Sequence, residues 1–186
     1  MKLSINKLTL MAILTAIALI IFMVEALIPL PISVPGVKLG LANTVTLFAL
    51  FYRGDGSFAL FKQKNKAEEP SPCFSAYNVL AILLCRIVLG AVFTGRPIVV
   101  VYSMTGGLFA FGAMLLIKRF VSEKQIWVCG AIGAIFHNIG QILAAILLTG
   151  THAITAYLPI LTITAIITGT TTGLIAQLTL KRISDI

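Results

Sequence analysis

The feature that most constrains the fold is a series of apolar runs, each near the length that crosses a lipid bilayer. The runs cover residues 8–28, 37–52, 77–94, 98–117, 126–148 and 154–180. A helix needs about 20 apolar residues to cross the hydrocarbon core, and every run except the second approaches that length. Because lipid cannot satisfy free backbone groups, the runs predict an all-α, polytopic membrane protein with six transmembrane helices.

The polar segments between the runs are short, with one exception. Residues 54–76 form the only extended stretch of low hydrophobicity, which predicts a flexible cytoplasmic loop. Overall, 59% of the residues are hydrophobic and 11% are charged, and a soluble domain of that composition would expose far too much apolar surface. We therefore expect residues 1–186 to form a single transmembrane domain.

Basic residues gather on one side of this arrangement. The N-terminal segment, residues 53–66, residues 118–124 and residues 181–182 hold most of the 14 Lys and Arg residues, whereas Arg96 and Lys38 fall on the other side. By the positive-inside rule, this asymmetry places both termini in the cytoplasm. The net charge of +8 is then a signal of topology, and it does not call for a nucleic-acid partner.

Four ionisable residues fall within or beside the spans, namely Glu25, Lys38, Arg86 and His137. A charged residue at the centre of a membrane helix costs about 2.5–3.5 kcal/mol on insertion scales. Such residues usually face the interior of a bundle, pair with one another or line a pathway. Glu25 and Lys38 flank the same extracytoplasmic loop. The second helix is expected to start after Pro35-Gly36, with its positive dipole end beside Lys38.

The segment HNIGQ (137–141) adds amides to these charges. His137, Asn138 and Gln141 are predicted to share one side of a helix and to point at one cavity, with Asn43 and Arg86 as partners across it. The excess of positive charge favours a small, anionic or strongly polar ligand, with Lys38 and Arg86 as the candidate anion contacts. Glu25 completes the predicted ligand-binding set.

A simpler alternative explains the same residues without a ligand. Polar side chains can join helices through hydrogen bonds worth about 0.6 kcal/mol each. Glu25 can serve only to neutralise Arg86 or Lys38. Lys38 can extend its ammonium group to the lipid headgroups.

Small residues form two pairs at four-residue spacing. Ala12 and Ala16 lie in the first run, and Gly169 and Gly173 lie in the last. Both pairs permit close approach of helices, either within the bundle or at the surface of another membrane subunit.

The motifs of several enzyme classes are missing from the sequence. It lacks the G-x-x-x-x-G-K-[ST] loop that holds nucleotides, and its only aspartates, Asp55 and Asp185, fall outside the spans. It also lacks a Ser/His/Asp set and metal-ligand spacings such as H-E-x-x-H. We therefore predict no catalytic residues, no metal site and no cofactor.

Four segments together resemble a known family: PGVKLGLAN (35–43), RIVLG (86–90), HNIGQ (137–141) and TGLIAQ (172–177). The family is heptaprenyl diphosphate synthase component I, also called the Gx transporter family, which resembles the substrate-binding S components of energy-coupling-factor (ECF) transporters. The likeness runs from about residue 8 to residue 182, although the loop at 62–72 is longer and more polar than the family implies. The resemblance implies an S-component-like bundle in a bacterial cytoplasmic membrane, with Ala12 and Ala16 docking on a coupling subunit.

Three hypotheses follow for the function. The first is a membrane substrate-binding subunit of an importer, which would take ligand from the extracytoplasmic side and rely on separate ECF coupling and ATPase subunits. The second is a non-catalytic membrane component associated with heptaprenyl diphosphate or menaquinone synthesis, whose partner would be a prenyl diphosphate synthase subunit. The third is a secondary carrier coupled to protons through Glu25 and His137.

Overall fold

The structure is a computed structural model that describes residues 5–28, 38–52, 74–95 and 97–184. Most of the polar loop predicted at 54–76 lies outside the described residues, as do Pro35 and Gly36. Arg96 and several of the basic residues behind the predicted orientation also lie outside them.

Within the described ranges the fold is all-helical, which confirms the predicted fold class. The longer helices are α1 (Ile5–Glu25), α2 (Asn43–Phe51), α3 (Ala76–Thr94), α4 (Pro97–Ile117), α5 (Ile126–Thr149) and α6 (Leu158–Ser184). Two short 3-10 helices, η2 (Glu123–Gln125) and η3 (His152–Tyr157), precede α5 and α6. Five of the described helices are long and apolar enough to cross a membrane, so the chain is a multi-pass membrane protein.

The second helix is shorter than predicted. α2 has 9 residues and begins at Asn43, whereas the apolar run begins at residue 37. Residues 38–42 are described but are not α-helical, and Gly40 has a φ of +79°, a left-handed conformation that interrupts a helix. At 1.5 Å per residue, α2 spans about 14 Å, roughly half of the hydrocarbon core. The positive end of its dipole therefore lies at Asn43, later in the sequence than predicted.

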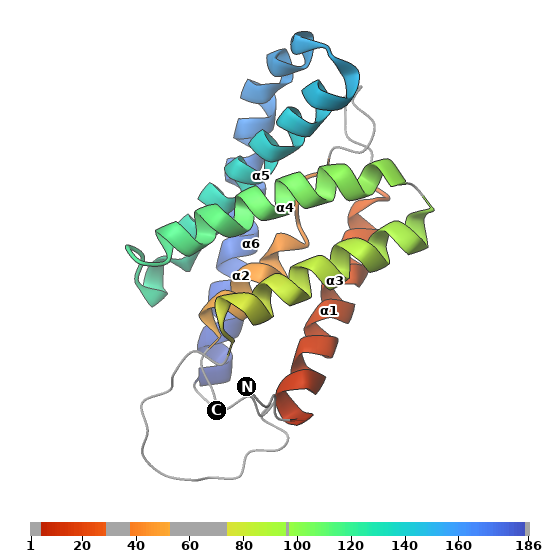
Figure 1. Ribbon diagram of the computed structural model, residues 1–186. Helices are drawn as coiled ribbons and strands as arrows, with labels where there is room; N and C mark the ends of the chain where they lie inside the picture. Colours follow the sequence, from red (N-terminus) through yellow and green to blue (C-terminus); the bar gives the residue numbers. More distant parts are fainter. Residues whose placement is uncertain (1–4, 29–37, 53–73, 96, 185–186) are drawn as a thin grey trace.

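The central elements of the bundle are α5 and the short α2. α5 packs extensively on α4 and on α6, while α1 packs mainly on α3. α2 contacts each of the other five long helices. Figure 1 shows α2 in the middle of the bundle, and the start of α1 and the end of α6 lie at the same end of it. This placement puts both ends of α2 among side chains from several helices.

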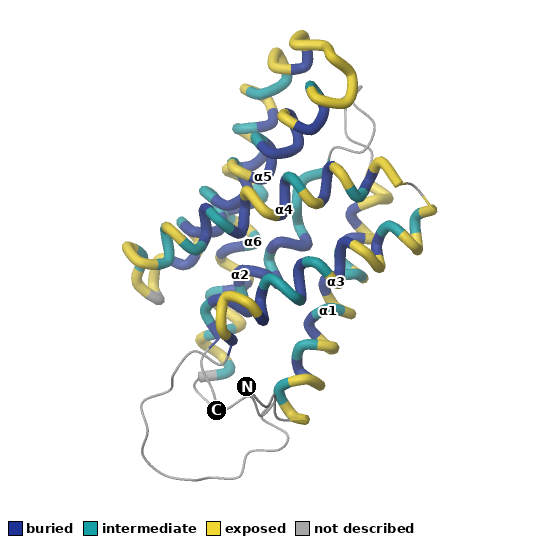
Figure 2. The backbone as a smooth tube through the Cα atoms, in the orientation of Figure 1, coloured by how far each residue is buried: buried dark blue, intermediate teal, exposed yellow. Residues whose placement is uncertain are grey.

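The first helix shows how the sequence sorts its faces. Its buried residues recur every three or four positions and form one stripe, made by Leu10, Leu14, Ala18, Phe22 and Glu25. The opposite faces carry exposed aliphatic side chains, including Ile13, Ile17 and Ile20. Figure 2 shows the same alternation of buried and exposed positions along the outer helices. Exposed apolar side chains are suited to lipid, so only the polar stripe residue Glu25 needs a partner within the protein.

The glycine pair of α6 packs inside the chain. A Cβ atom at Gly173 would lie 2.6 Å from the Trp127 Cα, and one at Gly169 would lie 2.7 Å from the Ala131 Cα. On α5, a Cβ at Gly130 would lie 2.6 Å from the Gly169 carbonyl oxygen. We call these five residues the α5–α6 seam. The seam favours the packing interpretation of the Gly169/Gly173 pair over docking to another subunit.

Candidate functional site

Most of the predicted polar residues meet near one end of α2. Glu25 is the last residue of α1, Asn43 is the first residue of α2, Arg86 lies in α3, and His137 and Gln141 lie in α5. All five side chains are buried, with Arg86 and His137 each 3% exposed. Charged and amide groups in a bilayer protein have few other places to find partners, and this explains why they converge.

One series of hydrogen bonds joins α3, α2, α5 and the segment before α2. Arg86 Nη2 donates to Asn43 Oδ1 at 3.4 Å, and Asn43 Nδ2 lies 3.1 Å from His137 Nδ1. On the other side of the ring, His137 Nε2 lies 3.0 Å from Gln141 Nε2. This series of hydrogen bonds ends where the backbone N–H of Lys38 donates to Gln141 Oε1 at 3.2 Å. These residues and Glu25 are named the polar network below.

Glu25 ties α1 to the segment that precedes α2. Its Oε1 atom accepts the backbone N–H of Gly40 at 2.5 Å. The carboxylate also lies within electrostatic reach of Lys38 and Arg86. The network thus holds two cationic side chains and one carboxylate, as the sequence suggested.

Asn138 does not join the network. Its Nδ2 atom donates to the Leu161 carbonyl oxygen at 2.7 Å, so the side chain faces α6. The prediction that Asn138 and His137 point at one cavity is wrong, because neighbouring residues on a helix are turned by about 100° from each other. Gln141, four residues after His137, does share its face.

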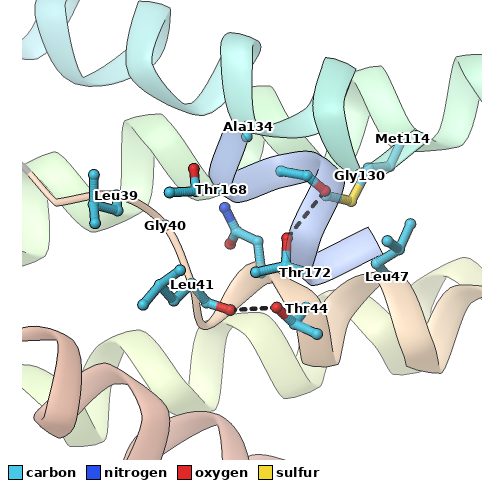
Figure 3. A pocket seen from close by; sticks show the side chains of 12 residues that line it. Leu39, Gly40, Leu41, Thr44, Leu47, Met114, Gly130, Ala134, Thr168 and Thr172 are labelled. Carbon is cyan, nitrogen blue, oxygen red and sulfur yellow. Dashed lines mark hydrogen bonds between the residues drawn. The ribbon is translucent and has the colours of Figure 1, made fainter. Parts of the chain in front are cut away.

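The space beside the network is small. A cavity of about 10 Å³ is lined by the segment before α2, by α2 itself and by α5 and α6. Thr44, Thr168 and Thr172 lie around it in Figure 3, and each hydroxyl group donates to a backbone carbonyl of its own segment. Such a volume holds about one water molecule. In this conformation the network residues bond mainly to one another.

Three further residues shape the site and were missed at the sequence level. The Lys38 Nζ atom lies 3.3 Å from the centroid of the Phe22 ring, which is a close cation–π contact. A Cβ at Gly90 would lie 2.8 Å from the same ring, so glycine is needed there for the ring to fit. A Cβ at Gly106 would lie 2.8 Å from the His137 ring. The available signals were the spacing of Phe22 from Glu25 and of Gly90 from Arg86, each of which places both residues on one face.

The predicted docking pair lies on the outside of the bundle. Ala12 and Ala16 are both exposed on α1, away from its buried stripe. Among the described residues, no group of three His, Cys, Asp or Glu side chains is placed to hold a metal ion.

The fold and the site define a polytopic α-helical membrane protein with a buried, charged network around a half-length helix. The chain belongs to the heptaprenyl diphosphate synthase component I family, which it matches over residues 14–61 and 72–179. The interruption at residues 62–71 coincides with the polar loop, and the whole polar network lies inside the matched ranges. No curated protein and no solved structure gives a significant match to the chain.

Proposed function

We propose that the chain is a non-catalytic membrane component that associates with a prenyl diphosphate synthase subunit. The observation that carries this proposal is membership of the component I family over most of the chain. The proposal that the chain is non-catalytic rests on the sequence. Both aspartates fall outside the spans, so the spans hold no aspartate-rich site for magnesium diphosphate.

The closed state of the network supports an accessory role. Its side chains bond to one another, and the neighbouring cavity is about the size of one water molecule. An accessory component needs no ligand cavity in its interior, and its contacts with an enzyme would be made by residues outside the bundle. We further propose a single transmembrane domain in a bacterial cytoplasmic membrane, with both termini in the cytoplasm.

Affinity purification from native membranes in a mild detergent tests this function. The tagged chain should retain a prenyl diphosphate synthase subunit, identified by mass spectrometry, through washes that remove abundant membrane proteins. Capture of an ATPase together with a membrane coupling subunit, and of no prenyl synthase, would contradict it.

A second function is favoured by a different observation. Arg86 is buried, yet its Nε atom has no hydrogen-bond partner among the described residues, and two cations in the network face one carboxylate. A buried cation with an unused donor suits an anionic ligand. This supports the substrate-binding subunit of an importer, in which separate ECF coupling and ATPase subunits would drive transport of a small anion.

The exposed alanine pair gives that second function its own test. Ala12→Trp or Ala16→Trp should block co-purification with a coupling subunit, because a bulky side chain prevents close approach of helices. Ile17→Trp is the matched control, since Ile17 is also exposed on α1 but on an adjacent face. Equal loss in all three variants would point to general disturbance of α1 and not to a docking face.

The proton-coupled carrier through Glu25 and His137 remains an alternative prediction. Uptake into proteoliposomes that contain only this chain, driven by a pH gradient, is the measurement that separates it from both other functions.

A further inference from the structure

The polar network contains more hydrogen-bond donors than it has acceptors to receive them. At one end, the Arg86 guanidinium can only donate, so Asn43 must turn its oxygen toward Arg86. At the other end, the backbone N–H of Lys38 can only donate, so Gln141 must turn its oxygen toward Lys38. Both amides therefore present their NH₂ groups to His137.

The imidazole ring cannot accept from both sides. A neutral histidine has one N–H and one acceptor nitrogen, and an imidazolium has no acceptor at all. His137 Nδ1 faces the Asn43 amide nitrogen at 3.1 Å, and Nε2 faces the Gln141 amide nitrogen at 3.0 Å. The ring also donates a hydrogen bond to the Gly106 backbone, so the ring N–H has an acceptor there, and the amide NH₂ group that faces the same nitrogen is left without one. One contact must set a donor against a donor, whichever tautomer is present.

The mismatch can be traced to a weak bond at Arg86. The Arg86–Asn43 contact is long, at 3.4 Å, and Arg86 Nε has no partner among the described residues although the side chain is 3% exposed. If another acceptor engaged the guanidinium, Asn43 would no longer need to face it. The Asn43 amide could then rotate by half a turn within its own volume and accept the His137 Nδ1–H.

We propose that the polar network binds an oxyanion, a carboxylate or a phosphate group, whose oxygens pair with the Arg86 guanidinium and release Asn43 to rotate. The bound state gives the Arg86 guanidinium an acceptor and removes the opposed contact between Asn43 and His137. A planar guanidinium pairs with either oxyanion through two parallel N–H···O bonds. This proposal rests on the ligand-binding function above and names the chemistry of its ligand.

One substitution separates the proposal from a purely structural role. In Asn43→Asp, a carboxylate would accept from Arg86 with one oxygen and from His137 Nδ1–H with the other, so the network would be satisfied without a ligand. We expect this variant to unfold at a higher temperature than the wild type, and to lose its response to added anions. A network that served only to join helices would also accept this carboxylate, but the wild type would then show no response to added anions.

The measurement is thermal unfolding of the purified chain in a neutral maltoside detergent. Sodium phosphate, sodium acetate and sodium chloride are compared as probes at constant ionic strength, with Asn43→Asp, Arg86→Gln and the exposed control Arg119→Gln. We expect a saturable rise of Tm in the wild type and Arg119→Gln with phosphate or acetate but not with chloride, and no rise in Asn43→Asp or Arg86→Gln. The relative response to phosphate and acetate identifies which oxyanion is preferred.

Three outcomes would overturn the proposal: no saturable rise in the wild type, an equal rise in Asn43→Asp, or an Asn43→Asp protein that is less stable than the wild type. The readout uses the isolated chain and no partner. A failure to capture coupling or synthase subunits therefore leaves this result intact, and the reverse also holds.

Discussion

Two regions of the bundle join helices by opposite means. In the α5–α6 seam, backbone meets backbone: a Cβ at Gly130 would lie 2.6 Å from the Gly169 carbonyl oxygen. In the polar network, long side chains from α1, α2, α3 and α5 meet, and their donors and acceptors do not balance. The seam has no freedom to rearrange, whereas the network can change partners by rotating one amide.

This difference assigns the two regions different roles. In lipid, helices gain little from burying apolar surface against each other, so close packing of small residues carries much of the association. The seam supplies that packing. The network costs desolvation of two cations and a carboxylate, and one donor remains opposed within it, so stability alone does not explain why it is there. The predictions below test whether the seam is rigid and the network adaptable.

The largest effect is expected in the seam. Gly130→Val places methyl groups against the backbone of α6, which cannot move away without separating the two helices. We expect a loss of more than about 3 kcal/mol and little monodisperse protein on size-exclusion chromatography. Gly112→Ala is the control, because its Cβ would meet nothing within 4 Å and α4 would gain helix propensity. A well-folded Gly130→Val protein would show that the seam is looser than its geometry indicates.

Substitutions in the polar network should cost less stability than Gly130→Val, and the effects of neighbouring charges should depend on each other. Glu25→Gln keeps an acceptor for the Gly40 N–H but removes the carboxylate that lies within electrostatic reach of Lys38 and Arg86, which should cost about 2 kcal/mol. Adding Lys38→Gln removes one of the two cations and should restore part of the lost stability, measured as Tm in a double-mutant cycle. Strictly additive losses would mean that the two charges do not interact.

The long helices could be predicted from the sequence because length and apolarity determine them in a bilayer. The runs at 77–94 and 98–117 each begin one residue after the observed starts of α3 and α4. The start of α2 could not be predicted in the same way. An apolar run does not reveal that Gly40 takes a positive φ and interrupts the helix.

The grouping of the site residues could be predicted because charged and amide side chains within membrane helices need partners inside the protein. Arg86, Asn43, His137 and Gln141 were expected together, and hydrogen bonds connect them. Asn138 was misplaced because the sequence gives the spacing but not which neighbour each helix face meets. Phe22 was missed because its spacing from Glu25 indicates only a shared helix face, and does not show that a lysine from another segment lies over its ring.

The Phe22 contact tests whether the network depends on apolar support. Phe22→Leu removes the ring beneath the Lys38 ammonium and should cost about 1.5 kcal/mol, a value typical of a desolvated cation–π contact. Phe109→Leu, at a 42% exposed position on α4, is the matched control and should change the unfolding temperature little. If the two variants lose equal stability, neither the cation–π contact nor the burial of the Phe22 ring contributes measurably.

The smallest effect concerns the opposite end of α2, where the Lys118 side chain bonds to the helix. The Lys118 Nζ donates to the Leu50 carbonyl oxygen at 2.5 Å, near the C-terminal end of α2, and lies 5.5 Å from the Phe51 ring centroid. The last carbonyls of a helix lack partners within it and carry partial negative charge, so a cation there is favourable. Lys118→Gln should therefore cost about 1 kcal/mol, against almost nothing for the exposed control Lys124→Gln. Because the two ends of α2 are held by separate contacts, the loss should add to that of Glu25→Gln in the double variant. A loss of stability in the double variant larger than the sum of the two single losses would mean that α2 transmits strain from the Lys118 end to the polar network. The network would then depend on the rest of the bundle as well as on its own hydrogen bonds.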